Sequence, residues 1–228
     1  MTGARERARV ALTAEIESLA RVQIERNGAS NLSLRAIARD LNMVSSAIYR
    51  YFASRDELLT RLIIHSYERL GDTVELADAS VRKRTDFAAR WKAITRSIRQ
   101  WAITNPSEYA LLFGTPVPGY KAPPDTIGPA TKYTLGLLNL LSDMEASGYT
   151  SKDKVPAALR KDLARFRTDL PTVSSDAMLM NGMLAWTNVM GAISLEVFGH
   201  FHNVVDTPGS LFEAVVDMHW LRLSASAR

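Results

Sequence analysis

Apolar residues recur at spacings of three and four along nearly the whole chain, and this period is typical of helices with one buried face. The pattern therefore predicts an all-α protein. It is weakest in the polar segment 148–171. The expected helices span about 5–27, 34–41, 43–52, 54–70, 87–101, a short stretch from 106, 135–144, 174–201 and 210–225.

Residues that favour helix ends lie between these segments. Asn27-Gly28 is a good left-handed exit from the first helix, and Pro106 is suited to the first position of a new one. Ser33 can cap the second helix, and Ser54 with Glu57 forms a capping-box pattern. The proline-rich stretch 114–124 must be a loop.

The segment 33–52 has the features of a helix-turn-helix, in which the second helix enters the major groove of DNA. Ala38 is small enough for a close helix crossing, and Asn42 tolerates a positive φ in the turn. Ile48 and Phe52, together with Met43 or Val44, can anchor the second helix. The outward positions are then Ser45, Ser46, Ala47, Tyr49, Arg50 and Tyr51. Hydroxyls can bond to bases or phosphates, and alanine can touch a thymine methyl group.

The stretch "LRAIARDLNMVSSAIYRYFASRDELL", 34–59, resembles the TetR family of transcriptional regulators. The resemblance implies an N-terminal three-helix helix-turn-helix DNA-binding domain, 1–53, joined to a C-terminal helical bundle for dimerisation and ligand binding, 54–228. The connecting helix would run from Ser54 to about Leu70. Two positions depart from the family pattern, because Asn42 stands where glycine is common and Val44 where serine or threonine is common.

Contacts with double-stranded DNA are implied by the same resemblance. Bases would be read near Ser45, Ser46 and Ala47, while Tyr49 and Tyr51 would contact the backbone. Arg5, Arg7 and Arg55 would hold phosphates. The full predicted DNA-binding set is Ser33, Arg35, Ser45, Ser46, Ala47, Tyr49, Arg50, Tyr51 and Arg55. The alternative for the outward positions is a solvated helix face.

The predicted helix 174–201 is apolar over so much of its circumference that it must be buried on two sides. Family members pair through their last two helices, which implies a homodimer on an inverted-repeat operator, with recognition helices 34–36 Å apart. The implied interface residues are Met190, Ile193, Val197, Phe198, Leu211, Val215 and Met218. Periodicity leaves open which face of the helix serves the interface and which a pocket.

A cavity for a small apolar effector is likewise implied by the resemblance. Its candidate lining is Trp91, Trp101, Phe113, Tyr120, Tyr133, Met183, Trp186 and Asn188. Aromatic and methionine residues at helical spacing can equally form plain core. Asn181 and Asn188 could fix the dimer register or bond an effector, and the loop 114–124 could gate the pocket or simply connect two helices.

No motif or residue cluster in the sequence supports catalysis. There is no cysteine, and the four histidines include only His200 and His202 as a close pair, whose spacing does not suit a helical zinc site. No phosphate-binding glycine loop or nucleophile motif occurs, so we expect no enzyme activity, metal or cofactor. The net charge is +4, and residues 1–70 hold eleven arginines against eight acids.

Neither a signal peptide nor a membrane span is expected, so the chain should be cytoplasmic. The function indicated is a dimeric, sequence-specific repressor released by an effector. The alternatives are a constitutive DNA-binding regulator whose C-terminal domain only dimerises and, more remotely, a helical enzyme or scaffold.

Overall fold

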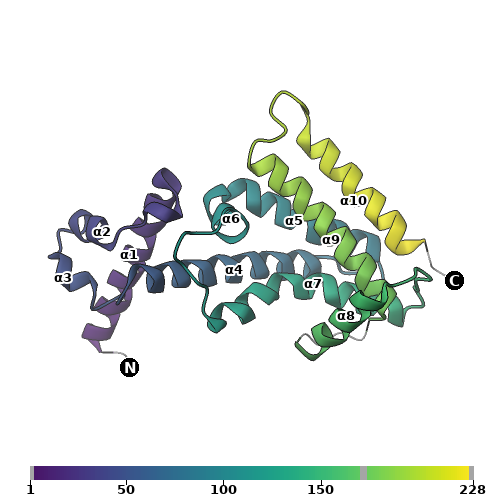
Figure 1. Ribbon diagram of the computed structural model, residues 1–228, viewed down its shortest axis with the longest axis horizontal. Helices are drawn as coiled ribbons and strands as arrows, with labels where there is room; N and C mark the ends of the chain where they lie inside the picture. The colour runs from purple at the N-terminus through teal and green to yellow at the C-terminus, as the bar shows by residue number, and fades with distance from the viewer. Residues whose placement is uncertain (1–2, 170–173, 226–228) are drawn as a thin grey trace. The chain divides into compact units, whose positions relative to one another are not determined.

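The computed structural model describes residues 3–169 and 174–225, which form helices, turns and loops (Figure 1). This confirms the predicted all-α fold. The α-helices are α1 (Ala4–Asn27), α2 (Leu34–Asp40), α3 (Ser45–Ile48), α4 (Arg55–Ser80), α5 (Phe87–Thr104), α6 (Pro106–Phe113), α7 (Ile127–Ala146), α8 (Ala157–Asp169), α9 (Asp176–Val197) and α10 (Pro208–Ser224). Two short 3₁₀ turns occur at Ala29–Asn31 and Pro124–Thr126.

The chain packs as two compact units. Unit 1 comprises Met1–Arg69 and Asn105–Ala130, and unit 2 comprises Leu70–Thr104 and Thr131–Arg228. The first boundary, between Arg69 and Leu70, falls within α4. Unit 1 also contains α6 and the proline-rich loop, because both lie in Asn105–Ala130. The functional boundary expected between residues 53 and 54 stays a prediction.

The core of unit 1 forms where α1, α2, α3 and the first half of α4 meet. Ile16, Ile37, Ile48 and Leu59 have no exposed surface, and each such side chain contributes about 1.5–3 kcal/mol when fully buried. Ala38 is also fully buried, as expected for a small residue at a close crossing.

The turn from α2 to α3 follows from one residue with a left-handed backbone. Asn42 has φ 53°, and the N–H of Met43 donates to the carbonyl of Ala38 at 2.8 Å. The N–H of Asn42 donates to the carbonyl of Arg39 at 3.0 Å, which completes a Schellman motif. Met43, rather than Val44, packs against the core, and this decides between the two predicted anchors.

Both predicted N-terminal caps are present. The hydroxyl of Ser33 accepts from the N–H of Ala36 at 3.4 Å, and that of Ser54 accepts from the N–H of Glu57 at 3.0 Å. The carboxylate of Glu57 reaches back to the N–H of Ala53 at 2.7 Å. These bonds fix where α2 and α4 begin, on either side of α3.

Unit 2 is a helical bundle in which α9 and α10 pack along each other (Figure 1). Its core contains Trp91, Ile98, Leu140 and Val216, all at most 1% exposed. A satellite cluster joins α7, α8 and α9 through Leu138, Val155, Leu163 and Leu179.

Several predicted helix limits were wrong. α3 ends at Ile48 instead of near Phe52, because residues 49–51 form turns, and α4 continues to Ser80. α9 ends at Val197, where Gly199, with φ 75°, closes another Schellman motif. The polar segment contains α8, whose partly buried or buried Leu159, Leu163 and Phe166 follow helical spacing; its predicted end at 170–171 lies outside the described residues.

Candidate nucleic-acid interface

α3 has one buried side and one exposed side. Ile48 and Phe52 are 0% and 4% exposed, and they hold the helix against α1, α2 and α4. Ser45, Ser46, Tyr49 and Arg50 are exposed, whereas Ala47 and Tyr51 are partly exposed. Every residue expected on the outer surface of this segment is thus at least partly accessible.

Other predicted DNA-contacting residues lie at the starts of α1 and α2. The Ser33 hydroxyl accepts the capping hydrogen bond from the N–H of Ala36. The N–H of Ser33 donates to Gln23 Oε1 of α1 at 2.6 Å. Arg35 is exposed in the first turn of α2. Arg5 and Arg7 are exposed near the start of α1.

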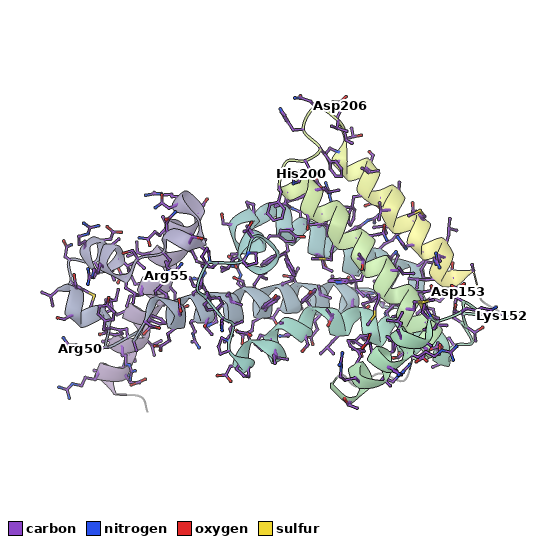
Figure 2. All side chains as sticks on the ribbon, viewed as in Figure 1. Arg50, Arg55, Lys152, Asp153, His200 and Asp206 are labelled. Atoms are coloured by element: carbon purple, nitrogen blue, oxygen red, sulfur yellow. The ribbon has the colours of Figure 1, made fainter. Side chains whose placement is uncertain are left out.

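Arg55 has partners inside unit 1 that the sequence did not reveal. Its Nη2 atom donates to the carbonyls of Ala29 and Ser30 at 3.0 and 3.1 Å, and its side chain remains 30% exposed. Arg55 therefore ties the start of α4 to the connection between α1 and α2 (labelled in Figure 2). These partners are 25 and 26 residues away, beyond the reach of local pattern.

A buried carboxylate also links α1 to α4. Glu17 is 5% exposed, forms ion pairs with Arg21 and Arg61 at 3.6 and 3.3 Å, and lies 2.9 Å from Nδ1 of His65. Sequence reasoning missed this cluster. The sequence feature that could have indicated this cluster is Glu17 itself. It follows Ile16 and lies on the same buried side of α1 as Ala20 and Ile24.

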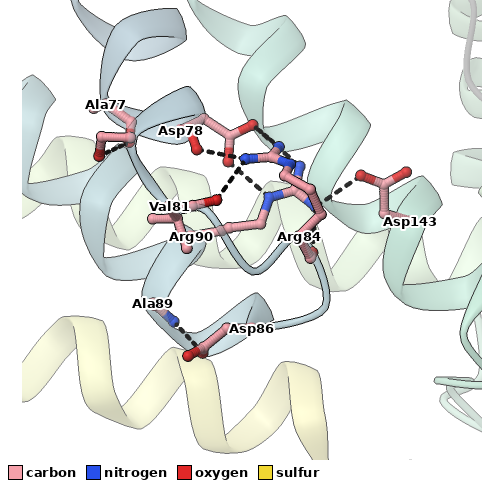
Figure 3. Close-up of polar contacts among 9 residues, drawn as sticks. Ala77, Asp78, Val81, Arg84, Asp86, Ala89, Arg90 and Asp143 are labelled. Carbon is pink, nitrogen blue, oxygen red and sulfur yellow. Dashed lines mark hydrogen bonds and ion pairs between the residues drawn. The ribbon is translucent and has the colours of Figure 1, made fainter.

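In unit 2, a fully buried arginine joins three helices (Figure 3). Arg90 of α5 donates through Nε to Asp78 of α4 and through Nη1 to Asp143 of α7, both at 2.7 Å. Burial alone would raise the pKa of Asp78, but hydrogen bonds and positive charge from Arg90 and Arg84 outweigh it and lower that pKa. This network braces the bundle at the end of α4.

A cavity of about 210 Å³ lies among α7, α8 and α9. Its described lining is Thr134, Leu137, Leu138, Leu141, Phe166, Leu179, Gly182, Met183 and Trp186. The predicted pocket set is not brought together as a group, because only Met183 and Trp186 line this space. Tyr133 stacks on Trp186, with ring centroids 5.1 Å apart.

The remaining predicted pocket residues lie elsewhere. Trp91 and Trp101 are core residues, and the Trp91 indole N–H donates to the Val216 carbonyl at 2.8 Å. Phe113 and Tyr120 belong to unit 1, where Phe113 packs against Tyr67 and Tyr109 and the Tyr120 hydroxyl bonds Thr60. Asn188 is exposed and bonds its own helix. The resemblance implied a cavity without fixing its lining, and aromatic and methionine residues at helical spacing can equally form core.

The predicted interface set is also divided by the structure. Ile193 is fully buried in its own unit, so its assignment to the interface was wrong. Met190, Val197 and Val215 are partly buried, while Phe198, Leu211 and Met218 are 40%, 38% and 54% exposed. The accessible stripe on α9 runs through Leu184, Asn188, the partly exposed Gly191, Leu195 and, just past the helix end, Phe198. The stripe on α10 runs through Leu211, Ala214, Met218 and Leu221, so Phe198, Leu211 and Met218 of the predicted set lie on these two stripes.

Asn181 has a structural role that separates it from Asn188. Its amide nitrogen donates to Ser151 Oγ and Asp153 Oδ2, at 3.0 and 2.9 Å, and its oxygen accepts from Arg222 at 3.4 Å. This 3% exposed amide fastens α9 to the segment before α8 and to α10.

Among the residues that the structure describes, no group of three or more histidine, aspartate or glutamate side chains is placed to hold a metal ion. None of their helices is sufficiently long and apolar to span a membrane.

The short helix α3 follows the capped helix α2 through a tight turn and exposes its outer side. This arrangement is typical of helix-turn-helix DNA-binding proteins. Comparisons identify the family of this chain. Residues 16–62 match the family described as bacterial regulatory proteins, tetR family, and residues 91–219 match the tetracyclin repressor-like C-terminal domain. The chain belongs to the TetR family of DNA-binding transcriptional regulators.

Relatives support the same assignment over nearly the full chain. The HTH-type transcriptional regulator Rv1816 of Mycobacterium tuberculosis H37Rv is 43% identical, over 93% of this chain and 92% of that protein. Mb1846 of Mycobacterium bovis matches equally. The crystal structure of SCO4313 is 35% identical with a TM-score of 0.78, covering 95% of this chain and 98% of that one. These homologues are regulators and not enzymes.

Proposed function

We propose that this regulator is a homodimeric, cytoplasmic repressor of an inverted-repeat operator and that a small apolar effector releases it. The observation that carries the proposal is the exposed surface of α3 and of the turn after it: Ser45 and Ser46 are exposed on the helix, Tyr49 and Arg50 are exposed in the turn, and Ile48 and Phe52 anchor both. Such a surface suits the major groove, because hydroxyls and guanidinium groups can bond base edges or phosphates.

The proposed division of labour follows the accessible groups. The bases are read by Ser45, Ser46 and Ala47. The sugar-phosphate backbone of the DNA is contacted by Ser33, Arg35, Tyr49, Arg50 and Tyr51, and these contacts fix the position of the protein on the duplex. Arg55 contributes less directly, because two of its hydrogen bonds go to the carbonyls of Ala29 and Ser30. Its 30% exposed side chain can still face a phosphate while it holds the loop.

The proposed dimer uses the exposed stripes of α9 and α10. Leu195 and Leu221 are 43% and 67% exposed, and residues in each stripe are spaced three or four apart, as helices that pack together require. Gly191 lies within the α9 stripe, with open space around its missing side chain, and would allow close approach of a second copy. Two recognition helices would then reach successive major grooves.

The proposed effector site is the cavity among α7, α8 and α9. Its described lining is aliphatic or aromatic except for Gly182 and Thr134, and the Thr134 hydroxyl donates to the carbonyl of Thr131 at 2.6 Å. An apolar environment disfavours a charged group, so an uncharged apolar compound is the expected occupant.

Duplexes selected from a random library by the full chain test the proposal. We expect an inverted repeat, bound by two chains per duplex in light scattering, with affinity that falls steeply as salt rises. A thermal-shift screen with uncharged apolar compounds should find one that raises the melting temperature and releases the duplex. Leu179→Phe should abolish this response by filling the cavity, whereas the control Ile103→Phe, at an exposed position, should retain it.

The same experiment distinguishes the alternative of a constitutive regulator. Two chains on each duplex with no compound that changes DNA affinity would favour that alternative. One chain on each duplex would contradict the dimer, and transcription that rises when the chain binds a promoter would contradict repression.

A further inference from the structure

Val44 is an apolar residue left in water at the start of the recognition helix. Its side chain is 70% exposed, and it lies directly before α3. Its exposed neighbours Asn42, Ser45, Ser46 and Arg50 are polar or charged. A β-branched hydrocarbon in this setting requires an explanation, because the rest of the helix-turn-helix follows the expected separation of apolar and polar sides.

The backbone, and not a mobile side chain, sets this exposure. The left-handed Asn42 and the bond from the Met43 N–H to the Ala38 carbonyl direct Met43 into the core. The next residue, Val44, has an extended backbone with φ −65° and ψ 136°, and it is thereby placed on the outer side. The turn that builds the motif therefore presents Val44 together with α3.

Val44 does not stabilise the helix that it precedes. It occupies the N-cap position, where serine, threonine, aspartate or asparagine can accept a bond from a first-turn N–H. A valine side chain has no atom that can do this. The bond from the Ala47 N–H to the Val44 carbonyl involves backbone alone, so any residue could make it. The side chain thus neither caps the helix nor joins the core.

The chemistry of the major groove offers one apolar group at its base edges, the 5-methyl group of thymine. Val44 and Ala47 are three residues apart around the first turn of α3, so their small apolar side chains lie on neighbouring positions of one surface. Phosphates are a poor partner for an isopropyl group because it would displace their water without offering a hydrogen bond.

We propose that Val44 contacts the 5-methyl group of one thymine in each half-site, so that this regulator selects thymine there by apolar contact. This inference rests on the proposed function. It makes Val44 a specificity-determining residue in addition to the polar set of α3.

Replacing thymine by deoxyuridine removes only the methyl group and gives a direct test. With duplexes selected from a random library by the full chain, each thymine of one arm is replaced in turn, and affinity is measured at fixed salt. One position should show about a fourfold loss, as expected for a methyl group of about 0.8 kcal/mol, and replacement in both arms about a fifteenfold loss. Val44→Ser should abolish this loss at that position and leave the other positions unchanged.

Val22→Ser is the matched control, since Val22 is another exposed valine of unit 1, on α1. It should keep the wild-type response to deoxyuridine. The inference is overturned if no thymine is sensitive, or if Val44→Ser shows the same losses as the wild type. A lower melting temperature of Val44→Ser would also overturn it, because serine can cap α3 and should preserve stability. Failure to enrich any sequence would instead overturn the proposed function itself.

Discussion

The outer side of α3 and the exposed stripes of α9 and α10 are both accessible, but they differ in chemistry. α3 exposes the hydroxyls of Ser45 and Ser46, the turn after it exposes Tyr49 and Arg50, and the exposed aliphatic side chain beside them is Val44. The α9 and α10 stripes expose leucine, phenylalanine and methionine side chains. The first surface suits a polyanion with hydrogen-bonding groups, and the second suits an apolar surface such as its own copy.

The exposed side of a helix indicates whether its partner is DNA or an apolar protein surface, whereas the buried side does not. Ile48 in α3 and Ile193 in α9 are both fully buried aliphatic residues. Neither indicates what the opposite side contacts. Substitutions that change one of these two surfaces and leave the other intact therefore separate the role in DNA binding from the role in self-association.

The largest expected effect comes from charging the α10 stripe. Met218→Glu combined with Leu221→Glu should separate the proposed dimer, because four carboxylates would be buried at its proposed two-fold interface. DNA affinity should then fall by about 10²-fold or more, through loss of the second binding site. Sedimentation equilibrium and fluorescence anisotropy measure the two effects. The control Val204→Glu, 76% exposed in the connection after α9, should remain dimeric; an unchanged mass for the double variant would refute this interface.

A smaller effect is expected from Arg50→Ala on the other surface. Removing the proposed phosphate contact from both chains should weaken binding by about tenfold for all sequences and reduce the slope of log affinity against log salt by about two, because each lost contact changes the slope by about 0.9. The dimer should persist. Anisotropy titrations at several salt concentrations measure the slope, and an unchanged slope would show that Arg50 does not face a phosphate.

Arg55→Ala tests whether a residue can serve both the fold and the DNA. Loss of its bonds to the carbonyls of Ala29 and Ser30 should lower the free energy of unfolding by about 1 kcal/mol, less than the about 1.5–3 kcal/mol usual for a hydrogen bond to a charged group, because the side chain is partly exposed to solvent. Urea denaturation measures this change. If the salt slope is also about two units shallower, because both chains lose a contact, Arg55 contacts a phosphate; an unchanged slope would restrict it to positioning the loop.

Two glycines of α9 separate its buried and exposed sides. A methyl group on Gly182 would lie 2.4 Å from Leu141 Cδ1, so Gly182→Ala should cost about 1–3 kcal/mol of stability. Gly191→Ala meets open space and should leave the stability of the single chain unchanged or higher, but weaken self-association. Urea denaturation and sedimentation distinguish these outcomes, and equal losses of stability would contradict the assignment of sides.

The smallest expected effect concerns His219 on the buried side of α10. Within the described residues its ring nitrogens have no hydrogen-bond partner, and burial, followed by the charge of Arg222, lowers its pKa. The unfolded chain then binds the proton more readily, so the free energy of unfolding should fall as pH drops below about 6.5. His219→Leu should lessen this fall in urea titrations, whereas the exposed control His200→Gln should not.

Local chemistry made most of unit 1 predictable. The positive φ of Asn42, the Ser33 and Ser54 caps and the burial of Ile48 depend on residues close in sequence, and the structure confirms them. The bonds of Arg55 and Glu17 could not be predicted in the same way, because their partners lie up to 48 residues away (Glu17 to His65). The DNA contacts themselves stay predictions.

Unit 2 was less predictable because its helices are apolar on more than one side. Spacing predicted that α9 is buried on two sides but could not say which positions face its own unit, so Ile193 was misassigned. The same limit made core residues such as Trp91 appear equivalent to Trp186 at the cavity. Fixing these positions required the packing of α5, α7 and α10.

The central claim is that the outer side of α3 lies against DNA bases, and a selection with Ser46→Gln tests it most directly. Glutamine can form two hydrogen bonds with adenine in the major groove. Sequences enriched from one random library by the wild type and by this variant should therefore differ at one position of each half-site, where the variant prefers adenine. Identical enriched sequences would contradict the claim.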